Sequence, residues 1–416
     1  MIVIENVGEL FLAAAASGPV RNDCEIRSLH GAYVCIDDGL IVDFGEGRPS
    51  LEPSLEYETI DACSGLVIPG LIDSHTHLVF AGTREDEFAM RCGGKSYLEI
   101  AKAGGGIQRT VTAVRAASLD ELVELALPRL ERMLSYGVTT VEVKSGYGLN
   151  VKDEIKMLEV VRKLAELQPI ELVGTYLAAH TLPAEYRDRR DAYVDLVVSD
   201  ELMGRVAADG LAEFCDVFCE DSAFTVDESR RVLEKGKERG LAPKIHADQI
   251  TQMGASRLAA ELGAVTAEHL EHIDAAGIEA LREASVIAGL IPGCSFYLGV
   301  PQAPARKLIE QRIPIAVSTD YNPGSSVVES LPLVLSIACT QAKMAPSEAL
   351  IGATVNGAAA LGRSARLGRI EKGMQADLVV LDVPSVDQWL YQVGRNAVAT
   401  VIKNGRIVYQ RHQRAS

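Results

Sequence analysis

The stretch LIDSHTHLVFAGTRE, residues 71–85, places His75 and His77 one residue apart at the end of an apolar run. In an extended chain, residues i and i+2 point to the same face of the strand. The two imidazoles are therefore expected to converge on one point, as two ligands of a metal ion do. A single pair of this kind is weak evidence, so the rest of the chain must supply the other ligands.

Strand-like and helix-like segments alternate through the middle of the chain. Stretches with helical periodicity, such as 119–137 and 226–240, separate strand-like runs that are rich in Val, Ile and Ala. The predicted strands are residues 66–75, 137–146, 170–180, 212–220, 242–248, 264–270, 286–293 and 313–320. Eight such βα units can close into a (β/α)8 TIM-like barrel of the α/β class.

Both ends of the chain are rich in short β-strands. Residues 1–7, 31–47 and 57–62 have this pattern, as do residues 376–383 and 397–410, where Asn404-Gly405 is a hairpin signal. We therefore expect a small β-sandwich domain built from both chain ends. The predicted division is 1–65 and 366–416 for the β-sandwich domain and 66–365 for the barrel.

Composition excludes several classes of function. The 416 residues carry a net charge of −16, which disfavours binding to nucleic acid and to anionic membranes. No apolar run reaches the roughly 18 residues that a membrane span needs, and no basic segment precedes the first apolar stretch. None of the eight cysteines forms a C-x-x-C pair, which indicates reduced thiols in a cytoplasmic protein.

Reactive side chains fall at the ends of the predicted strands, where barrels place their chemistry. The residues at these ends are His75, His77, His180, His246, His269 and Asp320. His75, His77, His246 and Asp320 offer three imidazole nitrogens and one carboxylate, which leaves a coordination position for water. This arrangement is typical of a catalytic Zn²⁺ or iron site, and a bound Zn²⁺ lowers the pKa of its water to roughly 7.

Several motifs make this chain resemble a known family. The barrel with "PGLIDSHTH" at its entry, together with the histidines and Asp320 at later strand ends, is similar to the amidohydrolase superfamily. Within it, the stretches "HTHLVFAGTREDEF", "SYLEIAKAGGGIQRTV", "VEVKSGYGL", "YLAAH" and "STDYNPGSS" resemble the imidazolonepropionase family. The resemblance covers most of the barrel and, more loosely, the β domain.

The resemblance implies a reaction and a cofactor. A metal-bound hydroxide would hydrolyse the ring amide of 4-imidazolone-5-propanoate to N-formimidoyl-L-glutamate, a step of histidine degradation. It implies one Zn²⁺ or Fe³⁺ per subunit, held by His75, His77, His246 and Asp320, and it suggests a homodimer. Asp320 would also take a proton from the attacking water, and His269 would hydrogen-bond the developing oxyanion or the water.

The resemblance also implies a set of residues around the substrate. In an acidic protein the propionate tail needs a local cation, and the planar fork of Arg84 suits a carboxylate. The family pattern places around the substrate Arg84, Tyr97, Tyr147 and His180. By resemblance, the newly formed α-carboxylate of the product contacts Asn322, Gly324 and Ser325 after the eighth strand. We expect the backbone N–H groups of Gly324 and Ser325 to form a small anion nest.

Gln249 stands where related deaminases, and some members of the imidazolonepropionase family, carry a glutamate as a proton shuttle. An amide can hydrogen-bond a ring nitrogen of the substrate, but it cannot transfer a proton at neutral pH. Gln249 is therefore expected to bind substrate and to act in catalysis only through hydrogen bonding. The proton for the leaving nitrogen must come from Asp320, His269 or water.

Two alternative functions remain open on the sequence. One is a single-metal deaminase of a purine or pyrimidine ring, against which Gln249 and Arg84 argue. The other is a barrel without catalysis that serves in assembly or regulation, against which the intact ligand set argues. Lys144 could also be a carbamylated lysine that bridges two metal ions, an interpretation that we disfavour. Residues Gly104–Gly106 are predicted to form a loop near the pocket.

Overall fold

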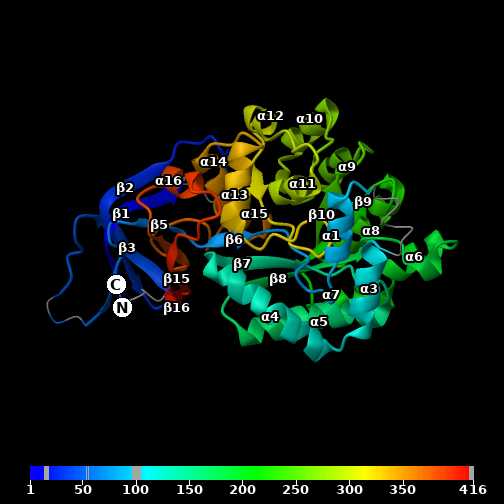
Figure 1. The fold of residues 1–416 in the computed structure, drawn as a ribbon, viewed down its shortest axis with the longest axis horizontal. Helices are drawn as coiled ribbons and strands as arrows, with labels where there is room; N and C mark the ends of the chain where they lie inside the picture. Colours follow the sequence, from blue (N-terminus) through cyan, green and yellow to red (C-terminus); the bar gives the residue numbers. More distant parts are fainter. Residues whose placement is uncertain (14–17, 53, 55, 96–104, 412–416) are drawn as a thin grey trace.

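The computed structural model describes residues 1–13, 18–52, 54, 56–95 and 105–411, and it contains two eight-stranded sheets. One is a parallel sheet surrounded by helices, as in a (β/α)8 barrel. The other is a mixed sheet that combines strands from the two ends of the chain. Figure 1 shows the mixed sheet at one side of the molecule, where the blue N-terminal and red C-terminal strands lie together. The predicted fold class is confirmed.

The barrel sheet contains all eight predicted strands, paired in sequential and parallel order. The strands are β6 (Leu71–Asp73), β7 (Val138–Lys144), β8 (Glu171–Ala179), β9 (Phe214–Cys219), β10 (Ala242–Ala247), β11 (Thr266–His269), β12 (Ile287–Leu290) and β13 (Ile315–Val317). Most of their residues are buried on both faces, as parallel strands covered by helices require.

Several helices begin after a residue whose side chain caps the first turn. The helix α5 begins after Asn150, whose side chain accepts a hydrogen bond from Asp153 N, and Ser118 with Glu121 forms a capping box before α4. The helices are α1 (Glu85–Cys92), α3 (Ile107–Ala116), α4 (Leu119–Ser135), α5 (Val151–Leu167), α6 (Arg190–Val197), α7 (Arg205–Ala208), α8 (Val226–Glu238), α9 (Ala255–Leu262), α10 (Ala275–Ala284), α11 (Pro292–Leu298), α12 (Ala305–Glu310), α13 (Leu331–Thr340), α14 (Pro346–Gly352), α15 (Val355–Ala360) and α16 (Val386–Tyr391). None of these described helices has the length and apolar character to cross a membrane.

The mixed sheet has the strand order β16-β15-β14-β5-β1-β2-β3, with β4 paired to β1. Its strands are β1 (Ile2–Ala13), β2 (Arg27–Asp37), β3 (Leu40–Glu46), β4 (Glu58–Asp61), β5 (Leu66–Pro69), β14 (Leu378–Leu381), β15 (Val398–Lys403) and β16 (Arg406–Gln410). The antiparallel pairing of β14 with β5 joins the two ends of the chain. The division of the chain at residues 65 and 365 stays an interpretation.

The first predicted barrel strand is in fact two strands. The sequence predicts one strand over 66–75, but β5 belongs to the mixed sheet and only β6 belongs to the barrel. Gly70 lies between them, and its N–H donates to the carbonyl of Asp377 at 2.7 Å. An apolar run carries no mark of which sheet each half joins, so this division could not be seen in the sequence.

The barrel closes through residues that follow β6 and β13. Thr76 and Tyr321 form a parallel bridge, in which Asp320 N donates to His75 O at 3.0 Å and His77 N donates to Tyr321 O at 3.0 Å. The two segments that complete the cylinder are therefore the segments that carry His75, His77 and Asp320.

Gly70→Ala is expected to destabilise the protein by roughly 1–3 kcal/mol, the usual effect of overpacking. A Cβ at Gly70 would lie 2.7 Å from Thr139 Cγ2 and nearer still to Thr139 Oγ1, so neither branch of the threonine leaves room. The free energy of unfolding in urea measures the effect. The control is Gly93→Ala, where φ is −78° and no atom lies closer than 3.4 Å to the added Cβ. Equal stability of the two variants would contradict the prediction.

Candidate active site and metal centre

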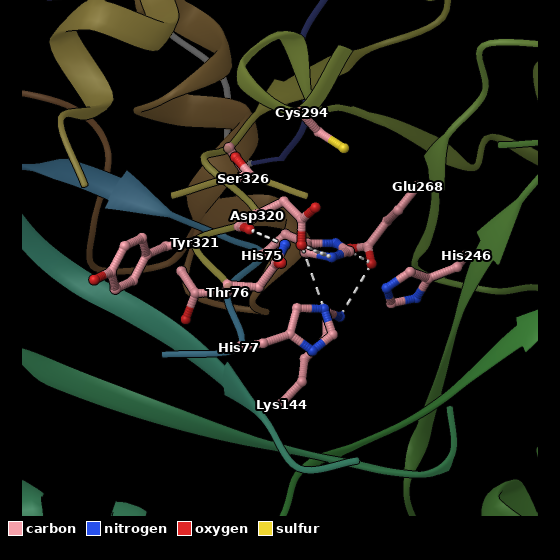
Figure 2. Close-up of polar contacts among 12 residues, drawn as sticks. His75, Thr76, His77, Lys144, His246, Glu268, Cys294, Asp320, Tyr321 and Ser326 are labelled. Atoms are coloured by element: carbon pink, nitrogen blue, oxygen red, sulfur yellow. Dashed lines mark hydrogen bonds and ion pairs between the residues drawn. The ribbon is translucent and has the colours of Figure 1, made fainter. Parts of the chain in front are cut away.

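His75, His77, His246 and Asp320 converge at the mouth of the barrel. Nε2 of His75 lies 3.5 Å and Nε2 of His77 lies 3.4 Å from Asp320 Oδ1. Potential ligand atoms of His75, His246 and His269 lie within 4.8 Å of one another, as do those of His75, His77 and Asp320. Figure 2 shows the side chains of His75, His77, His246 and Asp320 pointing toward one another. All are buried.

Two of the site residues have strained backbone conformations. Asp320 has φ of 52° and His269 has φ of 77°, both in the left-handed region that residues with a Cβ seldom adopt. The chain leaves the strand direction at each of these positions. Such strain is common where the surrounding structure must aim a functional side chain.

Buried carboxylates hold the far side of two imidazoles. Glu268 Oε2 lies 2.6 Å from Nδ1 of His75, and Asp216 Oδ2 lies 3.0 Å from Nδ1 of His246. A carboxylate oxygen favours a proton on the facing ring nitrogen, which turns the lone pair of Nε2 toward the centre. Burial opposes protonation of His75, yet the charge of Glu268 raises the pKa of this ring to about 9. The same electric field favours a metal cation.

A buried ion network lies behind these carboxylates. Lys144 Nζ lies 2.9 Å from Glu142, 2.8 Å from Asp216 and 3.0 Å from Glu268. Lys244 Nζ lies 2.8 Å from Glu142. Burial would lower the pKa of Lys144, but the three carboxylates raise it well above its usual value. An ammonium group cannot be carbamylated, so the structure supports the rejection of Lys144 as a bridging ligand.

The residues at the centre fit a metal ion. Nε2 of His75, which faces the centre, is buried without a hydrogen-bond partner among the described residues, which is costly unless another group satisfies it. Imidazole nitrogen together with a carboxylate is a donor set that Zn²⁺ and iron both accept. The chain therefore has a buried His/Asp cluster that fits a metal site.

Comparison with known proteins identifies the family. The model of the amidohydrolase family matches residues 66–408. An imidazolonepropionase of Fusobacterium nucleatum is 47% identical over 414 residues, covering 99% of each chain, and one of a Geobacillus strain is 45% identical over 414 residues, covering 98% of this chain and 97% of the relative. The chain belongs to the imidazolonepropionase family of amidohydrolases.

Solved structures outside the imidazolonepropionase family share the fold. A triazine hydrolase variant superimposes with a TM-score of 0.75 at 20% identity, covering 98% of this chain and 94% of that chain. An adenosine deaminase from Xanthomonas campestris with bound zinc gives a TM-score of 0.70 at 20% identity, covering 98% and 92% of the two chains. At this identity the likeness concerns the fold alone.

His180 and Tyr147 line one side of the centre in this imidazolonepropionase-family chain. The ring of His180 stacks on that of His77 with centroids 4.9 Å apart, and the ring of Tyr147 lies 5.4 Å from His180. Burial lowers the pKa of His180 to about 3, so this imidazole is neutral. Its Nδ1 lies 3.1 Å from the carbonyl of Gly146, which can only accept, so Nδ1 carries the proton and Nε2 is an acceptor.

The loop after β13 does not form the expected anion nest. The N–H groups of Gly324 and Ser325 both donate to Asn322 Oδ1 at 2.8 Å, while Asn322 Nδ2 donates to the carbonyl of Asp320 at 2.7 Å. The prediction of free donors was wrong because the side chain of Asn322 already satisfies them. These hydrogen bonds of Asn322 instead hold the backbone of the loop in place beside Asp320.

Arg84 lies next to this loop. It follows the barrel strand segment, begins α1 and places its guanidinium against the Cα of Gly324, where an added Cβ would lie 2.8 Å from Arg84 Cζ. The structure therefore brings Arg84, Gly324 and Asp320 into one region. Tyr97 and Gly104 lie outside the described residues.

Cys294 was missed by the sequence reasoning, which treated it as a core thiol. Its Sγ belongs to a buried group with His269 and Asp320, and Gln249 Nε2 contacts it at 3.9 Å. Gln249 therefore points toward the centre, whereas Asp248 faces away and accepts from Ala255 N at 3.3 Å. The only signal that could have pointed to Cys294 was its position in α11, four residues after the end of β12. The sequence analysis searched for reactive residues at the ends of strands and did not search the first turns of the helices that follow them.

Glu268→Gln is expected to weaken metal binding roughly 10–100-fold, as loss of a partner behind a histidine ligand does. The amide keeps the size of the side chain but loses the charge beside His75. Metal retained against increasing chelator measures affinity, and thermal unfolding with excess metal checks the fold. Unchanged metal affinity in a folded variant would contradict the role given to Glu268.

Proposed function

We propose that this protein hydrolyses the ring amide of 4-imidazolone-5-propanoate to N-formimidoyl-L-glutamate. The observation that carries the proposal is a buried His/Asp cluster, in which His75 is grouped with His77 and Asp320 and also with His246, in a chain nearly half identical to imidazolonepropionases. These four residues would hold one Zn²⁺ or Fe³⁺. When bound, the ion activates water and polarises the carbonyl oxygen of the substrate.

Asp320 acts as the base that receives a proton from the attacking water. Burial would raise the pKa of Asp320, but the neighbouring His75 lowers it below its usual value, so the carboxylate is ionised and ready to accept. The water oxygen bonds to the ring carbonyl carbon as the proton passes to Asp320. The fixed loop at Asn322, whose amide donates to the carbonyl of Asp320, keeps the carboxylate in place.

Asp320 also returns the proton to the leaving ring nitrogen when the C–N bond breaks. Gln249 cannot supply it, because an amide does not donate a proton at neutral pH. Gln249 instead holds the ring by hydrogen bonding from the side of Cys294. His269 donates to the oxygen that becomes negative, and one carboxylate therefore moves the proton across the whole reaction.

The other side chains bind the substrate. The acceptor Nε2 of His180 takes a hydrogen bond from a ring N–H, and Tyr147 packs against the same face. The guanidinium of Arg84 binds the propionate. Tyr97 completes the proposed set, and Ser325 and Gly324 border the new α-carboxylate of the product. The homodimer, which the family resemblance suggests, and the cytoplasmic location, which the cysteine usage indicates, stay predictions.

Incubation of the metal-loaded protein with 4-imidazolone-5-propanoate is expected to abolish the ultraviolet absorbance of the ring and to yield N-formimidoyl-L-glutamate. Release of ammonia in place of this product would instead indicate a deaminase. No loss of absorbance with metal-loaded protein would refute the proposed activity.

Arg84→Ala is expected to raise KM for this substrate roughly 10–100-fold, which is the loss of charge-assisted hydrogen bonds to one carboxylate. Metal content should stay at the wild-type level, because the hydrogen bonds and the ion pair that Arg84 makes with described residues are to Glu87. Steady-state kinetics and metal analysis on the same preparation separate the two effects. Loss of metal would show that Arg84 supports the centre and not the substrate.

A further inference from the structure

The first turn of α1 contains three acidic residues in succession, and only one of them faces inward. Glu85 and Asp86 are exposed, whereas Glu87 is 4% exposed. Helix starts favour acidic residues for electrostatic reasons, which accounts for Glu85 and Asp86. Burial of the third carboxylate is costly and needs another explanation.

Glu87 uses its two oxygens for two different tasks. Oε2 accepts from Nε of Arg84 at 3.0 Å and from Nη2 of Arg84 at 2.7 Å. Oε1 accepts from the backbone N–H of Gly106 at 2.9 Å. Gly106 precedes α3 and has φ of 95°, a conformation that favours glycine. One carboxylate therefore ties the start of α3 to the guanidinium of Arg84.

The Nη1 end of this guanidinium lies nearest to Gly324. A side chain at position 324 would collide with Nη1 of Arg84, so the arginine can lie there only because residue 324 has no Cβ. Arg91 Nη2 donates to the carbonyl of Gly324 at 3.0 Å and braces the same backbone. Within the described part of the chain, no hydrogen bond occupies Nη1 of Arg84, which leaves this end of the fork for an incoming acceptor.

The charges in this region suit one carboxylate. Arg84 and Arg91 contribute two positive charges and Glu87 one negative charge. A propionate then meets a single net positive charge. Burial would raise the pKa of Glu87, but Arg84 and the Gly106 N–H lower it below its usual value, so Glu87 stays ionised.

The geometry points to Glu87 as a positioning residue that, with the bare backbone of Gly324, fixes Arg84 as the receptor for the carboxylate of the substrate. This inference rests on the proposed function, in which Arg84 binds the propionate. Glu87 touches neither substrate nor metal. It sets the orientation of the fork, and thereby the preference for a substrate with an anionic tail.

The test compares Glu87→Gln, Glu87→Asp and Gly324→Ala with Glu85→Gln, which removes an exposed carboxylate from the same helical turn. KM and kcat are measured for 4-imidazolone-5-propanoate and for its propionamide analogue, which has the same ring and an uncharged tail. Glu87→Gln and Gly324→Ala should raise KM for the propionate about tenfold, which corresponds to the loss of one charge-assisted hydrogen bond to the substrate. The value of kcat should change less than threefold.

The remaining comparisons separate positioning from general damage. KM for the propionamide should be the same in Glu87→Gln as in the wild type, and Glu87→Asp should recover part of the affinity for the propionate. Glu85→Gln should match the wild type for both compounds. Equal losses for the two compounds would overturn the inference, because they would mean that Glu87 only supports the fold.

Arg84→Ala distinguishes failure of this inference from failure of the proposed function. If Arg84→Ala raises KM for the propionate and Glu87→Gln does not, Glu87 has no positioning role and the inference falls alone. A lower KM in Glu87→Gln would also overturn it, since Glu87 would then compete with the substrate for Arg84. If Arg84→Ala itself leaves KM unchanged, the proposed carboxylate receptor is wrong.

Discussion

The backbone bridge between Thr76 and Tyr321 is the interaction on which the site depends. It closes the barrel, and its hydrogen bonds run through the peptide groups of His75, His77, Asp320 and Tyr321. His75, His77 and Asp320 are thus adjacent because the cylinder is complete. Asp73 reinforces the same seam by accepting from Thr319 N at 3.0 Å and from Thr319 Oγ1 at 2.6 Å. The hydrogen bonds that close the barrel therefore also fix the positions of the residues at the centre.

The charges beneath the centre determine what it can hold. Glu142, Asp216 and Glu268 surround Lys144 and Lys244 in the barrel interior, where water is excluded. Three carboxylates against two ammonium groups leave an excess negative charge next to His75 and His246. In a medium of low polarity such an excess is stable only beside a cation. The same side chains therefore pack the barrel interior and favour a positive charge beside His75 and His246.

The sequence predicted the barrel well because two independent signals agreed. Parallel strands covered by helices are continuous apolar runs, and functional side chains of a barrel lie at their C-terminal ends. The apolar runs marked eight segments, five of which end in a histidine or an aspartate, and His75, His77, His246 and Asp320 followed from the two signals together. The assignment of further residues around the substrate came from the family resemblance and remains proposed.

What the sequence did not predict depends on contacts between distant segments. The division at Gly70 follows from the pairing of β5 with β14, more than 300 residues away. The satisfied N–H groups at Gly324 and Ser325 depend on the rotamer of Asn322. The burial of Glu87 could not be predicted, because an acidic residue in the first turn of a helix usually faces water. Its burial is explained by the position of Arg84, which donates to its carboxylate.

The most direct test of the metal centre is a crystal structure of the metal-loaded protein with anomalous diffraction measured at the absorption edge of the bound metal. One anomalous peak should lie among His75, His77, His246 and Asp320, with Glu268 and Asp216 remaining on the far sides of His75 and His246. A peak that lies elsewhere, or an Asp320 carboxylate turned away from the ion, would contradict the proposed site and the hydrolysis built on it.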